Sequence, residues 1–175
     1  MSEALGDARA RTPECDEVDR LLAAWRSARP DLDPAPLAVL SRISRLSRHL
    51  DRARQRVLEA QDLELWEFDV LVALRRSPNP HQLSPGALVH ATMVTSGTMT
   101  NRIDRLERRS LVRRGPDPAD GRGVLVRLTE AGCERADAAM SDLLARERGL
   151  LAQLDPSEQQ TLARLLRTLL LPLDS

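Results

Sequence analysis

Two short helices joined by a tight turn, with a hairpin directly after them, constrain the fold of this chain more than any other feature. Ser84 and Pro85 predict the start of the first helix, which we expect over residues 86–92, because serine caps helix N-termini and proline suits the first helical position. Thr95 caps a second helix that runs to about Arg109. Two helices in such close succession are typical of a helix-turn-helix.

The segment after these helices has the pattern of a β-hairpin. Two apolar runs, 111–114 and 124–128, flank the segment 115–123, which is rich in glycine, proline and aspartate. Apolar runs on either side of such a loop predict paired strands. A hairpin directly after a helix-turn-helix predicts a winged helix. The expected fold class is therefore mainly α, a winged helix-turn-helix with a small β-wing.

Further helices are expected on both sides of this lobe. Apolar residues spaced three and four apart predict an additional N-terminal helix from Val18 that ends before Pro30. The same spacing predicts a long amphipathic helix from Leu37 to Val57. The other expected helices run from about 65 to 75, from 129 to about 154 and from 155 to near 172.

The C-terminal helices carry more leucine than a small lobe can cover. Nine leucines lie between residues 150 and 171. Two copies of the chain can cover such a surface for one another, so we expect a homodimer. A coiled-coil pairing with a different protein is the alternative.

Several function classes lack their usual sequence signals. The three histidines fall in different expected elements, and the sequence has neither a phosphate-cradling glycine loop nor a nucleophile elbow. The two cysteines are too few and too far apart for a zinc site or a disulfide framework. No apolar run is long enough for a membrane span, and the acidic start is unlike a signal peptide. We therefore expect a cytoplasmic protein that is not an enzyme, with no cofactor, metal or membrane partner.

The charge of the chain is balanced in total but uneven along its length. The sequence has 26 basic and 26 acidic residues. Residues 95–127 hold eight arginines against four acidic residues, whereas residues 1–35 hold five against eight. A basic segment that coincides with the helix-turn-helix predicts a local face for a polyanion. The expected polyanion is double-stranded DNA.

The second helix of the motif is the expected DNA-reading element. Met99, Ile103 and Leu106 share one face, which predicts its core side. Short polar residues and a glycine near the N-terminus let a helix approach a duplex, while asparagine and arginine bond base edges in the major groove. An ordinary amphipathic surface helix is the alternative. The expected DNA-binding residues of this helix are Ser96, Gly97, Thr98, Thr100, Asn101 and Arg105.

The hairpin tip supplies one further candidate. Arg122 follows Asp120 and Gly121 at the expected tip. An arginine on a protruding loop can enter the minor groove, where the potential is most negative. Asp120 could hold that arginine in position. A solvated charged turn is the alternative for any single hairpin, and it is disfavoured where the hairpin follows a helix-turn-helix.

The DNA-binding lobe resembles the MarR family of bacterial regulators. The flanking helices agree with that family in order and length. The resemblance implies a homodimer bound to a pseudo-palindromic operator, and repression that a small ligand relieves. The matching segments are 86–88, 94–107, 111–114, 117–123 and 126–132.

The additional N-terminal helix extends the resemblance to the urate-responsive branch of that family. The ligand site of that branch combines a tryptophan on the extra helix, an aspartate before the helix-turn-helix, an arginine in the recognition helix and an arginine opening the wing. The matching residues are Trp25, Asp69, Arg102 and Arg114. The resemblance implies that Trp25 and Arg102 bind a small anion such as urate. It also implies an Asp69–Arg114 ion pair, which the anion would disturb.

The expected organisation of the chain follows from these assignments. It is a disordered segment 1–14, N-terminal helices for dimerisation and a ligand pocket in 15–62, a DNA-binding lobe in 63–130 and dimerisation helices in 131–175.

Other assignments of these residues stay open. Trp25 completes an apolar stripe and could be a core residue, and Arg102 could contact phosphate. Arg113 could replace Arg114 in the ion pair, because neighbouring strand residues point to opposite faces. Another planar or carboxylate anion could be the effector.

A cysteine-based redox sensor is a further alternative within the same family. Acidic neighbours surround Cys15, and negative charge opposes formation of a thiolate. Cys133 follows Thr129 in the first turn of an expected helix, which would favour a thiolate mildly. Packing in the core is the other assignment of Cys133.

Overall fold

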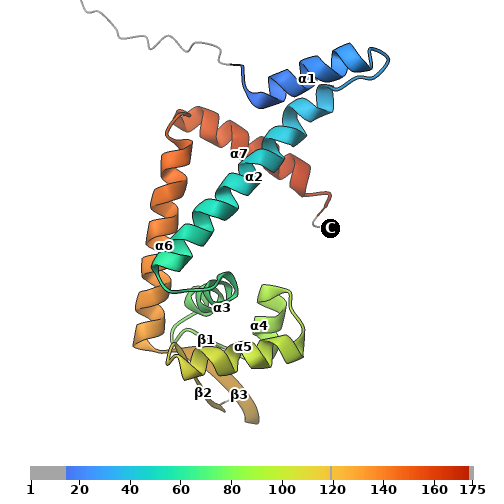
Figure 1. Cartoon of the computed structure of the whole chain (residues 1–175). Helices are drawn as coiled ribbons and strands as arrows, with labels where there is room; N and C mark the ends of the chain where they lie inside the picture. The colour runs from blue at the N-terminus through green and yellow to red at the C-terminus, as the bar shows by residue number, and fades with distance from the viewer. Residues whose placement is uncertain (1–14, 119, 174–175) are drawn as a thin grey trace, which may run out of the picture. The chain divides into compact units, whose positions relative to one another are not determined.

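The computed structural model describes residues 15–118 and 120–173, with all their side chains except those of 120–122. It confirms the predicted mainly α winged helix-turn-helix (Figure 1). The predicted disorder of residues 1–14 lies outside the described residues. The elements are α1 (Glu17–Ala28), α2 (Ala35–Ala60), α3 (Leu65–Arg76), β1 (Gln82–Leu83), α4 (Pro85–Thr92), α5 (Ser96–Arg108), β2 (Val112–Asp117), β3 (Asp120–Leu128), α6 (Glu130–Leu151) and α7 (Pro156–Leu170).

The chain forms two compact units, Met1–His49 and Leu50–Ser175, which divide inside α2. In the first unit, Asp16 caps α1 by accepting a hydrogen bond from the amide of Val18 at 2.8 Å. Arg42 on α2 donates to Asp16 at 2.8 Å. That hydrogen bond is the main reason why the pKa of Asp16 falls to about 2. An ion pair and a helix cap therefore fix the start of α1 together.

Helix α3 lies at the centre of the second unit. Its residues are apolar on nearly every side, and a helix with that pattern is stable only when neighbours cover it. It packs between α6 and α4, and it also contacts α5 and β3 (Figure 1). The side chains buried in this core include Val70, Leu71 and Leu74 of α3 with Leu88, Met99, Ile103, Leu106 and Val126.

The wing is part of a three-stranded antiparallel sheet with the order β1-β3-β2. The predicted hairpin is β2 and β3, and Val112 pairs with Leu128 at its base. Strand β1 was not predicted, because two residues are too few to show the alternation that marks a strand. Gln82 and Leu83 pair with Arg127 and Val126, so β1 anchors the base of the wing.

The expected helix starts are confirmed by capping hydrogen bonds. The hydroxyls of Ser84, Thr95 and Thr129 each accept from a backbone amide three residues later, at 3.2, 3.3 and 3.0 Å. The helix ends are less accurate. Helix α6 ends at Leu151, three residues earlier than expected, and α7 begins at Pro156. In the described part of the chain, no helix combines the length and the apolar character needed to cross a membrane.

Candidate nucleic-acid interface

The exposed face of α5 is the first part of the candidate interface. Met99, Ile103 and Leu106 are buried, as expected, so the opposite face of the helix lies at the surface. The residues predicted to bind DNA near the start of α5 are all exposed, namely Ser96, Gly97, Thr98, Thr100 and Asn101. Among the described residues, the Asn101 side chain has no hydrogen-bond partner in the protein. Its amide is therefore available to an external partner.

The N-terminus of α5 suits an anionic partner. Its first turn contains no acidic residue. The first amides of a helix point outward and carry partial positive charge, which favours a phosphate. Gly97 lies in this turn, and a Cβ built on it meets no atom within 4 Å. The absence of a side chain at Gly97 therefore serves no contact inside this chain, and it leaves room for a close approach from outside.

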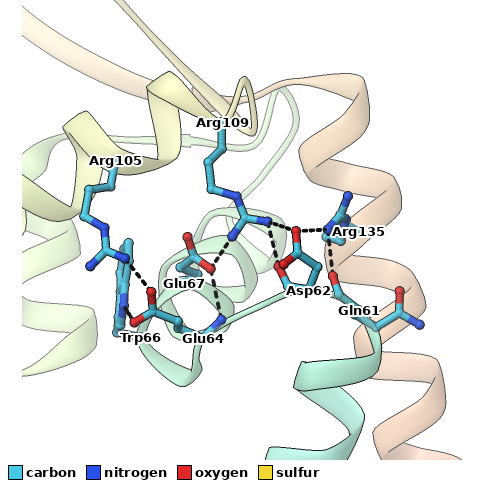
Figure 2. A network of polar contacts seen from close by, with 8 residues as sticks. All are labelled: Gln61, Asp62, Glu64, Trp66, Glu67, Arg105, Arg109 and Arg135. Atoms are coloured by element: carbon cyan, nitrogen blue, oxygen red, sulfur yellow. Dashed lines mark hydrogen bonds and ion pairs between the residues drawn. The ribbon is translucent and has the colours of Figure 1, made fainter.

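Arg105 lies differently from the other predicted DNA-binding residues. Its guanidinium hydrogen-bonds the carboxylate of Glu64, just before α3. It also lies 4.6 Å from the centre of the Trp66 ring (Figure 2). Arg102, for which the resemblance implies a role in ligand binding, is half-buried and lies 5.5 Å from the same ring. Trp66 therefore meets two arginines of α5.

The Glu64 carboxylate is fixed from a second side. The indole Nε1 of Trp66 donates to its Oε2 at 2.6 Å. This hydrogen bond, followed by the one from Arg105, lowers the pKa of Glu64. Sequence reasoning missed this group. Its members come from α5 and from the start of α3, and no spacing in the sequence indicates that they meet.

Arg109, at the C-terminal end of α5, forms a second network beside the first (Figure 2). It donates at 2.6 Å to Glu67, which is only 1% exposed. It also donates at 2.6 Å to the backbone carbonyl and the carboxylate of Asp62. Arg135 of α6 donates at 2.7 Å to the carbonyl of Gln61. Arg109 and Arg135 therefore hold the turn between α2 and α3 in place. The contacts of Arg109 also fix the C-terminal end of α5.

The Asp69–Arg114 ion pair expected from the resemblance is wrong in this structure. Arg114 pairs with Asp104 and with Glu107, the latter at 2.6 Å. Its backbone amide also donates to Glu107 at 2.9 Å. The physical reason is proximity, since both acids lie on α5, which packs against the start of β2. The wing is therefore tied to the recognition helix. The Arg122 side chain at the wing tip lies outside the described residues.

Asp69 lies instead among three arginines. It is half-buried, and burial raises its pKa even though the charges of Arg54, Arg102 and Arg76 oppose that rise. Among the described side chains, none forms an ion pair with it. The structure therefore brings Asp69 and Arg102 into one electrostatic environment. Trp25 belongs to the first unit, where its side chain is 43% exposed, so it is not a core residue of that unit.

A cavity of about 410 Å³ lies between the end of α2 and the start of α3. Its apolar part is formed by Leu58, Leu63 and Leu65. Its charged part holds three carboxylates and a single guanidinium, that of Arg54. An acidic lining of this kind does not suit an anionic ligand. The surroundings of Asp69, with three arginines, suit an anion better.

The two cysteines lie in different settings. Cys15 is exposed, and Cys133 is half-buried and packs against the core from the first turn of α6. Among the residues that the structure describes, no group of histidine, cysteine or carboxylate side chains is arranged to hold a metal ion.

Comparison with known proteins gives one consistent result. Residues 61–123 match the MarR family. The chain is 37% identical over 150 residues to the HTH-type transcriptional regulator PecS of Dickeya dadantii, covering 86% of this chain and 90% of PecS. A cysteine-to-serine mutant of MarR from E. coli, solved with operator DNA, is 28% identical with a TM-score of 0.59, covering 83% of this chain and 97% of that one. BpsR of Bordetella bronchiseptica, described as regulated in its DNA binding by 6-hydroxynicotinic acid, is 28% identical with a TM-score of 0.60, covering 75% and 91%.

Proposed function

The chain belongs to the MarR family of DNA-binding transcriptional regulators, and we propose that it is a cytoplasmic repressor that a small anion such as urate releases from its operator. The observation that carries the DNA-binding part is the exposed N-terminal half of α5. That half combines the outward-pointing amides of the helix start, an open glycine and an exposed asparagine whose side chain has no hydrogen-bond partner among the described residues. These are the features that a helix needs to enter a major groove.

A homodimer on a pseudo-palindromic operator is part of the proposal. Leu165, Leu169 and Leu170 of α7 are each about half exposed in the single chain. Large leucines exposed in a row are costly in water, and a second copy would cover them. A twofold dimer presents two recognition helices, which matches an operator with two related half-sites.

The effector part of the proposal rests on the surroundings of Asp69. Three arginines act on one half-buried carboxylate, so the local charge is positive. Arg102 and its neighbouring arginines would attract a small anion, and the charge of that anion would repel Asp69. BpsR responds to 6-hydroxynicotinic acid, a planar aromatic acid. Urate is also planar and anionic, and the resemblance to the urate-responsive branch favours it for this chain.

A mobility-shift titration tests the effector. The DNA is a duplex that the wild-type protein enriches from a random library, and urate and 6-hydroxynicotinate are titrated in parallel. We expect urate to release the DNA, and we expect Arg102→Gln and Trp25→Phe to need more urate. If only 6-hydroxynicotinate releases the DNA, the effector is an aromatic carboxylate and not urate. If neither compound releases the DNA, the proposal of an anionic effector fails and the proposal of DNA binding stands.

A further inference from the structure

One arginine of the recognition helix turns away from the surface that we assign to DNA. Thr98, Asn101 and Arg105 lie three and four residues apart on α5, so they start from one side of the helix. The first two side chains stay at the surface, where the Thr98 hydroxyl shares a hydrogen bond of 2.9 Å with that of Thr95 at the helix start. The third ends at Glu64 and Trp66, beside the start of α3 (Figure 2).

Glu64 and Trp66 together form a receptor for a guanidinium group. The indole Nε1 of Trp66 donates to Oε2 of Glu64 at 2.6 Å, which fixes the ring and the carboxylate relative to one another. The other carboxylate oxygen, Oε1, accepts from Arg105. The guanidinium lies over the ring face, 4.6 Å from its centre. A carboxylate and an aromatic face are the two groups that bind guanidinium well.

The contact is weak enough to open. The side chains of Arg105 and Glu64 are 49% and 55% exposed. An exposed ion pair and an exposed cation–π contact each change an equilibrium constant by roughly fivefold at most. A DNA phosphate competes strongly for an arginine, because each neutralised phosphate also releases bound counterions. Arg105 starts from the same side of α5 as Thr98 and Asn101, so a rotation about its side-chain bonds turns the guanidinium toward the surface that we assign to DNA.

We propose that Glu64 and Trp66 form a latch that holds Arg105 in the free protein and releases it to a phosphate when α5 docks on DNA. The inference rests on the proposed DNA binding by α5. Glu64 and Trp66 are then positioning residues that lower the affinity for DNA. Arg102 lies 5.5 Å from the same ring and keeps a cation near the Trp66 face after Arg105 has left.

A double-mutant cycle on DNA binding tests the latch. The dissociation constant of the enriched duplex is measured over a range of salt concentrations for the wild type, Glu64→Gln, Arg105→Gln and the double variant. We expect Glu64→Gln to bind about three- to tenfold more tightly. We expect Arg105→Gln to bind more weakly and to lose about 0.9 from the slope of log affinity against log salt. In the Arg105→Gln background, Glu64→Gln should increase the affinity for DNA much less.

The outcomes separate the latch from the proposed function. Removal of a negative charge strengthens DNA binding through space in both backgrounds, so an equal gain in both would overturn the latch. Weaker binding by Glu64→Gln, or an unchanged salt slope in Arg105→Gln, would also overturn it. If the wild type binds no duplex, the proposed function itself fails.

Fluorescence gives an independent readout. The chain has two tryptophans, so Trp25→Phe leaves Trp66 as the only indole. We expect the emission of this variant to change when DNA is added, because Arg105, the nearer of the two cations at the ring, leaves while Arg102 remains. The change should vanish when Arg105→Gln is added. An emission that DNA does not alter would contradict the release of Arg105.

Discussion

At the scale of single residues, Gly132 is a position where one added methyl group is expected to lower the stability of the fold strongly. A Cβ built on it lies 2.0 Å from the carbonyl oxygen of Leu111, at the base of the wing. Gly132→Ala must therefore push α6 away from the wing, and we expect it to lower the free energy of unfolding by at least about 2 kcal/mol. Urea denaturation measures this change.

Gly149 on the same helix is the matched control. A Cβ at this position meets no atom within 4 Å. Gly149→Ala should therefore raise the free energy of unfolding by about 0.5 kcal/mol, because alanine favours helix more than glycine does. Equal effects of the two substitutions would contradict the close approach at Gly132.

Asp69 carries a charge that burial disfavours. Its pKa is raised in the folded state by burial. The contribution of Asp69 to stability is therefore greatest below the ordinary pKa of aspartate, and it is lost as the pH rises through the raised value. We expect Asp69→Asn to melt at a higher temperature than the wild type at pH 7, with a difference that shrinks toward pH 4. A destabilised Asp69→Asn at pH 7 would contradict this account.

At the scale of elements, the turn between α2 and α3 fixes the recognition helix through Arg109. Arg109→Met leaves the carboxylate of Glu67, which is 1% exposed, without its cation. We expect this to lower the free energy of unfolding by about 3 kcal/mol. Arg20→Met breaks the exposed pair with Glu17 and should cost less than about 1 kcal/mol. Addition of Glu67→Gln to Arg109→Met should recover part of the loss, and no recovery would contradict a charge effect.

The helices and the hairpin could be predicted from the sequence, because periodic apolar residues and capping side chains are local signals. The core face of α5 followed from the same periodicity. The partners of the arginines could not be predicted in this way. Glu64 and Arg105 are 41 residues apart in the chain, so only the packing of α5 against α3 brings them together. Arg114 forms ion pairs with Asp104 and Glu107, ten and seven residues before it in the chain, and not with the more distant Asp69.

At the scale of the whole molecule, the proposed dimer makes DNA binding depend on α7. Leu165 and Leu169 are each 49% exposed in the single chain. We expect sedimentation of the wild type to give twice the mass of one chain, and the double variant Leu165→Glu, Leu169→Glu to give the mass of one chain. The variant should also bind DNA more weakly, because it presents one recognition helix. If the wild type sediments with the mass of one chain, the proposal of a dimer is wrong.

The affinity of α5 variants for DNA tests the central claim most directly. Gly97→Ala meets no atom inside this chain, and Asn101 has an exposed side chain, so neither Gly97→Ala nor Asn101→Ala should lower the melting temperature. Fluorescence anisotropy with the enriched duplex gives the dissociation constants. We predict that Asn101→Ala binds roughly five- to 100-fold more weakly and that Gly97→Ala also binds more weakly than the wild type. Two folded variants that bind the duplex as tightly as the wild type would contradict the claim that this helix enters DNA.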